Sequence, residues 1–108
     1  MDPRVADLAD QLLLIERELR VHALWDSFPP DACALASQEP FCVDTLSFEQ
    51  WLQWVFLPRM KTILEEDEAL PAVSGILAMA ETVYQGRSQQ MAGLLQALER
   101  FDALISRG

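Results

Sequence analysis

Histidine, cysteine and the common catalytic motifs are scarce or missing in this sequence, and each absence narrows the chemistry. His22 is the single histidine, so a histidine-rich metal site cannot form. Cys33 and Cys42 have neither a C-x-x-C nor a zinc-ligand spacing, and we expect both to be reduced thiols. A Cys–His dyad would lack an orienting third group, and no phosphate loop, dinucleotide fingerprint or Gly-x-Ser-x-Gly motif is present. We therefore expect no enzymatic activity and no metal or cofactor.

Long apolar runs and positive charge are also lacking. The longest apolar run near the start, residues 12–15, is too short for a signal peptide or a membrane span, so we expect a cytoplasmic protein. Eight Lys and Arg face 17 Asp and Glu, giving a net charge of −9. This balance disfavours direct binding to nucleic acid or to anionic membranes, and it suits a basic protein partner.

What is present predicts one helical domain. The 108 residues are 51% hydrophobic, enough for a single core, and no alternating apolar–polar run indicates a strand. The spacing of apolar residues predicts an all-α bundle of four main helices, covering residues 1–108, with a long ordered connection between the first two.

The first helix is predicted to begin at Asp2 as N-cap and Pro3 as first helical residue, and to end near Trp25. Leu13 and Leu14 widen its apolar stripe beyond one face. They are covered either within the monomer or by a second copy of the chain in a homodimer. His22 completes the stripe or pairs with Glu18. The stripe itself consists of Val5, Leu8, Leu12, Ile15, Leu19 and His22.

The connection from residue 26 to residue 46 contains Pro29, Pro30 and Pro40 and lacks helical periodicity. Its apolar content is too high for a flexible linker. We expect no regular structure there, with the second half lying across the helices.

Ser47 and Gln50 form a capping box that predicts the start of the second helix, and Pro58 predicts a kink or interruption within it. The acidic run at residues 65–68 is interpreted as a solvated turn on the N-terminal side of a third helix beginning at Pro71. The predicted inward residues of the second helix are Phe48, Trp51, Leu52, Val55, Phe56, Met60, Ile63 and Leu64.

The third helix is predicted from Pro71 to Tyr84, with Gly86 as its C-cap, and Ser88 is predicted to cap the last helix. Gly75 and Gly93 fall inside these predicted helices, where either close helix packing or simple tolerance of glycine would explain them. The inward residues are Val73, Ile76, Leu77, Ala80, Val83 and Tyr84, then Met91, Leu94, Leu95, Leu98, Phe101 and Ile105.

One constellation stands out as a candidate partner or ligand surface. Trp51 and Trp54 are three residues apart, which places them on one side of an α-helix, and Arg59 could pair with Asp44 or Glu49. The alternative is structural: the connection folds over the second helix and the aromatic rings form its core. Both interpretations use Phe41, Asp44, Thr45, Trp51, Trp54, Pro58 and Arg59.

The same residues carry a family resemblance. Pro40-Phe41, Asp44-Thr45, Trp51 to Trp54, Pro58 to Met60 and Leu70-Pro71 make a pattern that resembles the YqcC-like family of bacterial proteins of unknown function. The resemblance implies a small helical fold in the bacterial cytosol. Some members bear the label tRNA pseudouridine synthase C, but such a synthase needs a large α/β catalytic domain and a basic RNA cleft, which this sequence does not predict.

Two functional hypotheses follow. The first is a non-catalytic protein-binding accessory module, associated with a tRNA pseudouridine synthase, that binds through the aromatic and arginine face. The second is a small-ligand-binding helical protein with a pocket between the connection and the second helix. Direct catalysis or tRNA binding ranks last.

Overall fold

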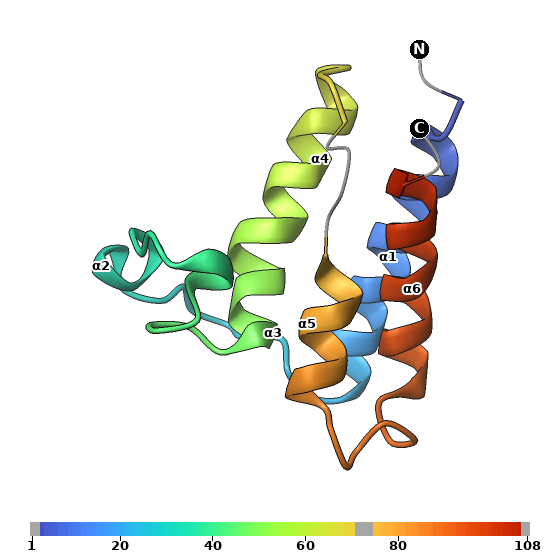
Figure 1. The fold of residues 1–108 in the computed structure, drawn as a ribbon. Helices are drawn as coiled ribbons and strands as arrows, with labels where there is room; N and C mark the ends of the chain where they lie inside the picture. Colours follow the sequence, from blue (N-terminus) through green and yellow to red (C-terminus); the bar gives the residue numbers. More distant parts are fainter. Residues whose placement is uncertain (1–2, 71–74, 107–108) are drawn as a thin grey trace.

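Every regular element in residues 3–70 and 75–106, the part of the chain described by this computed structural model, is helical. The predicted all-α class with four main helices is confirmed: α1, the continuous α3–α4 helix, α5 and α6 form a bundle (Figure 1). The elements are α1 (Val5–Val21), α2 (Ala32–Leu35), a 3-10 turn (Pro40–Cys42), α3 (Phe48–Trp51), a π-helical turn (Leu52–Phe56), α4 (Leu57–Glu65), α5 (Ile76–Val83) and α6 (Ala92–Ser106).

The four main helices alternate in direction. In the view of Figure 1 the chain descends in α1, ascends through α3 and α4, descends in α5 and ascends in α6. α1 contacts both α4 and α6, and α5 contacts α6. The antiparallel order predicted from the short connections is therefore correct.

The core is made by the predicted stripes of α1 and α6. Leu8, Leu12, Ile15 and Leu19 of α1 are at most 2% exposed, and they form one cluster with the inward residues of α6. Full burial of one such side chain contributes about 1.5–3 kcal/mol, so this pairing is a main source of stability. The inward residues of α6 are Leu94, Ala97, Leu98, Phe101 and Ile105, with buried Met91 just before the helix, and Ala97 was not predicted.

The predicted ends of the first helix are wrong. The helix begins at Val5 after an Arg4 cap position, with Pro3 ahead of it, whereas Asp2 lies outside the described residues. It ends at Val21, so Trp25 is not part of it. Ala23 adopts φ +58°, and the N–H groups of Ala23 and Leu24 donate to the carbonyls of Arg20 and Leu19 in a Schellman pattern. Alanine rather than glycine holds the left-handed position, so the usual sequence signal for a helix end is missing there.

The starts of the third and fourth helices also differ from the prediction. α5 begins at Ile76, and Gly75 precedes it with φ +65° instead of lying inside a helix; Pro71 and Val73 lie outside the described residues. α6 begins at Ala92, so its N-cap position is Met91 and Ser88 lies three residues too early to be its cap. Gly86 does have the predicted left-handed conformation, with φ +85°.

Three further expectations are confirmed. A Cβ on Gly93 of α6 would lie 2.7 Å from Cδ of Glu18, so the glycine allows the close approach of α6 to α1. Glu18 in turn pairs with His22 at 3.6 Å between Oε1 and Nε2. The acidic residues 65–68 are all exposed, at the end of α4 and in the turn after it.

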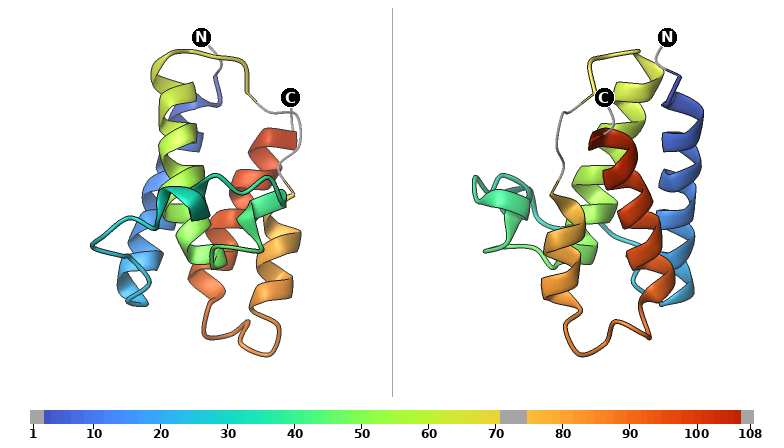
Figure 2. Two further views of the ribbon diagram at one scale, coloured as in Figure 1. Left: turned by 90° about the vertical axis from the view of Figure 1, so that its left-hand side faces the viewer. Right: turned by 45° about the vertical axis from the view of Figure 1, so that its right-hand side comes forward.

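The connection is more structured, and less closely packed, than predicted. It contains α2 and the 3-10 turn instead of irregular chain alone. We call residues 27–45 the arm, because Figures 1 and 2 show this segment projecting from the bundle beside α3 and α4. Phe41 packs on Trp51, but Val43 is 58% and Phe28 is 83% exposed. The expectation that the second half lies across the helices therefore holds only at a few residues.

Candidate functional site

The second helix changes its winding where the candidate residues lie. The predicted capping box is present: the N–H of Gln50 donates to Ser47 Oγ at 3.1 Å, and the N–H of Ser47 donates to Gln50 Oε1 at 3.0 Å. A π-helical turn then covers Leu52–Phe56, where the N–H of Leu57 donates five residues back to the carbonyl of Leu52. Pro58 follows directly. A π-turn leaves one carbonyl without its usual donor, so the missing N–H of proline costs little here.

The predicted interruption is therefore a local widening, and the chain stays helical from Phe48 to Glu65. The widening shifts the faces of the helix. Leu57, which the predicted stripe omitted, is 1% exposed, whereas Val55 of that stripe is only half-buried.

The two tryptophans consequently line different hollows. Three residues turn through about 300° in an α-helix but through a smaller angle in the wider π-turn, so Trp51 and Trp54 do not share one face. Trp51 lines a hollow of about 550 Å³, the Phe41 hollow, and Trp54 lines one of about 570 Å³, the Trp25 groove. The predicted single surface is wrong in this respect.

Phe41, Trp51 and Arg59 meet at the Phe41 hollow. The ring of Phe41 meets Trp51 edge-on at a centroid distance of 4.8 Å, and Trp51 stacks on Phe56 at 5.4 Å. Phe56 contacts Phe101 of the core at 5.0 Å, so aromatic rings run from the arm into the bundle. The remaining lining residues are Val55, Met60, Ile63, Ala69 and Ile76.

Arg59 is exposed at this hollow. It forms no hydrogen bond or ion pair with any residue that the structure describes. The predicted pairs with Asp44 and Glu49 do not form. The Glu49 carboxylate instead accepts a hydrogen bond from the hydroxyl of Tyr84 at 2.8 Å. An exposed guanidinium beside aromatic rings can bind a partner group without first breaking an internal ion pair.

Asp44 and Thr45 hold the arm together and face neither hollow. Asp44 accepts a hydrogen bond from the hydroxyl of Ser37, and the hydroxyl of Thr45 donates to the carbonyl of Ala34 at 2.7 Å. Within the same segment Phe41 and Cys42 both have positive φ, +58° and +49°, which is an uncommon and strained conformation for residues with side chains. These residues therefore fix the shape of the arm at the point where Phe41 turns onto Trp51.

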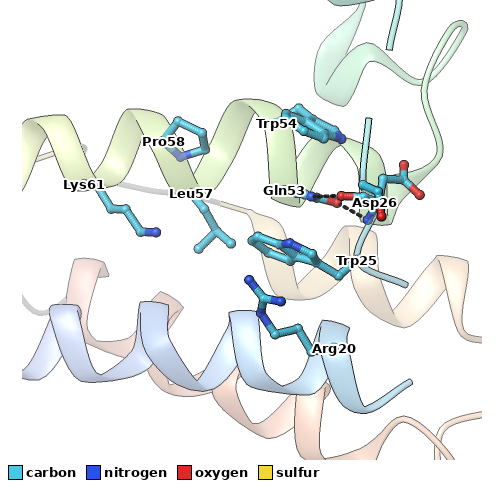
Figure 3. A pocket seen from close by; sticks show the side chains of 9 residues that line it. Arg20, Trp25, Asp26, Gln53, Trp54, Leu57, Pro58 and Lys61 are labelled. Atoms are coloured by element: carbon cyan, nitrogen blue, oxygen red, sulfur yellow. Dashed lines mark hydrogen bonds between the residues drawn. The ribbon is translucent and has the colours of Figure 1, made fainter. Parts of the chain in front are cut away.

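The Trp25 groove lies between the end of α1 and the second helix, and Figure 3 shows the residues that line it. Trp54 and Pro58 of the predicted set belong here. The guanidinium of Arg20 lies 4.5 Å from the centre of the Trp25 ring, a cation–π contact. The other lining residues are Asp26, Ser27, Gln53, Leu57 and Lys61.

Gln53 connects this groove to the root of the arm, and the sequence did not reveal it. The side chain is 5% exposed; its Oε1 accepts from the Asp26 N–H at 2.7 Å and its Nε2 donates to the Asp26 carbonyl at 2.8 Å (Figure 3). Because Gln53 is occupied in this way, it does not accept a hydrogen bond from the indole N–H of Trp54. That N–H is buried without a hydrogen-bond partner in the described residues.

Two titratable groups with raised pKa values lie at or against the ends of α5: Tyr84 is buried and Asp102 is half-buried. Burial, and then the hydrogen bond to Glu49, raises the pKa of the Tyr84 phenol well above its usual value. Asp102 of α6 accepts the N–H of Leu77 at 2.9 Å and so caps α5, where Gly75 has no side chain to do so. Burial raises the pKa of Asp102, and the N–H groups of Leu77 and Ile76 oppose that rise.

The residues considered for metal or thiol chemistry lie apart. Cys33 is exposed on the arm and Cys42 is buried, both as free thiols. Within residues 3–70 and 75–106, no three His, Cys, Asp or Glu side chains are grouped as metal ligands would be. No helix in these ranges has the length and apolar character needed to cross a membrane.

Comparison with known proteins places this geometry in a family. The family model described as DUF446, tRNA pseudouridine synthase C, matches residues 7–104. An uncharacterized protein of Haemophilus influenzae is 42% identical over 92 residues, covering 83% of this chain and 84% of that protein. The uncharacterized protein YqcC of Escherichia coli K12 is 34% identical over 96 residues, covering 89% of this chain and 88% of YqcC.

One relative is longer. A Pectobacterium carotovorum protein named tRNA pseudouridine synthase C is 39% identical over 87 residues, which are 81% of this chain but 23% of that protein. The solution NMR structure of YqcC from E. coli superposes with a TM-score of 0.84 at 31% identity, covering 97% of this chain and 90% of YqcC. The family model matches most of the length of this chain, and the chain has the fold of YqcC. The predicted resemblance is thus confirmed: this chain belongs to the DUF446 family.

Proposed function

We propose that this chain is a non-catalytic accessory module that binds a tRNA pseudouridine synthase through the Phe41 hollow and the adjoining arm. The observation that carries the proposal is the longer Pectobacterium relative, in which a segment like this chain makes up 23% of a protein bearing the synthase name. A segment that is joined to another domain in one protein often acts beside that domain when the two are separate.

The geometry of the Phe41 hollow suits a protein interface. Arg59 is exposed beside the rings of Phe41 and Trp51, and Val43, two residues after Phe41 on the arm, is also exposed. Arginine and aromatic residues dominate the energetics of protein interfaces. The net charge of −9 favours a basic partner, and proteins that bind RNA are commonly basic.

The proposal is tested by calorimetric titration of the purified chain into the purified synthase of the same bacterium. Arg59→Ala is expected to weaken the complex about tenfold or more, the effect of losing one central interface arginine. Arg100→Ala, which removes the same charge from an exposed position on α6, is the matched control and should bind like the parent chain.

Absence of any complex would refute this partner, and equal weakening by both arginine variants would refute this surface. A parallel titration with tRNA separates the remaining possibility. Tight binding of tRNA by the chain alone, weakening steeply with salt, would make it an RNA-binding protein instead.

A second candidate function has its own observation. A small-ligand pocket between the connection and the second helix would occupy the Trp25 groove, a hollow of about 570 Å³ with tryptophan walls and two cations, Arg20 and Lys61. A screen of aromatic carboxylates that follows tryptophan fluorescence tests it. Saturable quenching that is lost in Trp25→Leu would support the pocket, and the absence of quenching by every compound would remove it.

A further inference from the structure

The outer face of α1 is apolar and uncovered. Leu13 is 64% exposed and Val21 is 65% exposed, whereas exposed leucine and valine are otherwise rare in the bundle. The right-hand view of Figure 2 shows α1 at the edge of the molecule, with none of the drawn elements on its outer side. Neither Leu13 nor Val21 lines the Phe41 hollow or the Trp25 groove, so the proposed function does not account for their exposure.

The charges on this face are not used within the chain. Asp10 and Arg17 are exposed, and neither has a recorded hydrogen bond or ion pair with another described residue. They are seven residues apart, which is about 10 Å along a helix, too far for them to pair with each other. Arg20, by contrast, pairs with Glu16 at 3.2 Å. The face is therefore acidic in its first half and basic in its second half.

We propose that this face of α1 is the contact between two copies of the chain, paired antiparallel about a two-fold axis near Leu13. Asp10 and Arg17 lie at equal distances on either side of the midpoint between residues 13 and 14, and so do Ala6 and Val21. In an antiparallel pair Asp10 of each copy therefore faces Arg17 of the other, and Ala6 faces Val21. A two-fold interface requires this kind of self-complementarity.

The groove beside the face gives Leu13 of the second copy a place to pack. Between α1 and α4 lies a hollow of about 220 Å³ lined mainly by alkyl groups, with Leu13 at its edge. A contact through one helix face buries less than the roughly 800 Å² per copy of a standard interface, so the dimer is a weak one. The lining residues are Ala9, Leu12, Leu13, Lys61, Leu64 and Glu65.

Charge reversal at Asp10 and Arg17 tests the pairing. Each reversal alone should weaken the dimer, and mixing the two variants should restore it, which an effect within one chain would not do. Asp10→Arg places two like charges opposite each other at both ends of the contact, and Arg17→Asp does the same with the opposite sign. Sedimentation velocity over a range of concentrations should show each variant monomeric where the parent chain dimerises, with the dissociation constant raised roughly tenfold or more. An equimolar mixture of the two variants should dimerise again, since every Arg then faces an Asp.

The mixture also separates this contact from the helix dipole, which favours acids near the start of α1 and bases near its end in any case. A dipole effect would weaken both variants without any recovery on mixing. Asp31→Arg and Arg100→Asp, at exposed positions off the face, are the matched controls and should leave the dimer unchanged. A parent chain that stays monomeric at submillimolar concentration, or a dimer that neither reversal affects, would overturn the proposal.

Discussion

The bundle and the arm use the same apolar residue types in opposite ways. Phe101 of α6 is 0% exposed in the core, whereas Phe28 of the arm is 83% exposed. In the bundle, apolar residues recur every three or four positions and the helices satisfy their own backbone groups. In the arm, proline interrupts that pattern, and short side-chain hydrogen bonds such as Thr45 to Ala34 hold the chain instead. The difference indicates that the bundle supplies stability and that the arm displays surface.

The arm is attached to the bundle at its two ends. Gln53 holds its root by two hydrogen bonds to Asp26, and Phe41 packs on Trp51 near its far end. Phe28 between these points and Val43 just beyond Phe41 remain exposed. Apolar residues that a rigid scaffold leaves in solvent are typical of binding surfaces. The proposed site therefore includes the arm.

The largest expected difference between the two regions comes from a matched pair of phenylalanine substitutions. Phe101→Ala leaves a cavity in the core and should lower the free energy of unfolding by about 3–5 kcal/mol. Phe28→Ala, the same change on the arm, should alter it by less than about 0.5 kcal/mol. Urea unfolding followed by circular dichroism measures both. Comparable losses in the two variants would show that the arm is part of the core after all.

The next effect concerns the joint between arm and bundle. Gln53→Ala leaves the N–H and carbonyl of Asp26 without partners in a buried place, which should cost about 2 kcal/mol. Amide hydrogen exchange should accelerate in the arm while the slowest amides of α6 change only with global stability. Gln96→Ala on the exposed side of α6 is the control. Unchanged amide exchange in the arm of the Gln53 variant would show that its hydrogen bonds to Asp26 do not hold the arm.

A smaller effect is expected within the bundle, in the pH dependence of stability, and Tyr84, the single tyrosine of the chain, reports it. The raised pKa of buried Tyr84 means that the folded protein keeps its phenol protonated, whereas the unfolded chain ionises near pH 10. Stability contributed by this group is thus complete below pH 10 and lost as pH rises beyond it. Absorbance at the phenolate band should therefore rise only together with the loss of helical circular dichroism.

Tyr84→Phe supplies the control, because it removes the phenolate signal and leaves the Glu49 carboxylate without its hydrogen bond, at a cost of about 1 kcal/mol. An ionisation near pH 10 in a chain whose helical signal is intact would show that Tyr84 is accessible to solvent.

Sequence reasoning was most successful where periodicity carries the information. The capping box at Ser47, the left-handed Gly86 and the buried residues of α1 and α6 other than Ala97 were predicted, because spacing and residue type determine them locally. The end of α1 was missed because Ala23 takes a position that usually calls for glycine.

The candidate site was predicted only in part, because its geometry depends on a change in helix winding. The residues around Pro58 were identified, but the π-helical turn that separates Trp51 from Trp54 has no clear signature in a single sequence. The pairing of Gln53 with the Asp26 backbone likewise joins groups far apart in the chain, and nothing in the local pattern of either residue indicates it. Long-range contacts between polar groups are what the sequence pattern leaves undetermined.

The smallest expected effect again sets the bundle against the arm, now through pH. Asp102 caps α5 from within the bundle, and burial raises its pKa, so the folded state binds a proton more readily than the unfolded chain does. Its contribution is therefore fully present below the unfolded pKa and is lost as pH rises through the folded one. Asp102→Asn keeps an acceptor for the Leu77 N–H without the charge, and should change stability at neutral pH by less than about 1 kcal/mol, toward greater stability. As pH falls, the parent chain should gain on this variant in urea unfolding. Asp31→Asn on the exposed arm, which removes a carboxylate that makes no capping hydrogen bond, is the control. A difference between Asp102→Asn and the parent chain that does not change with pH would mean that the Asp102 carboxylate is solvated, and that α5 begins without a buried cap.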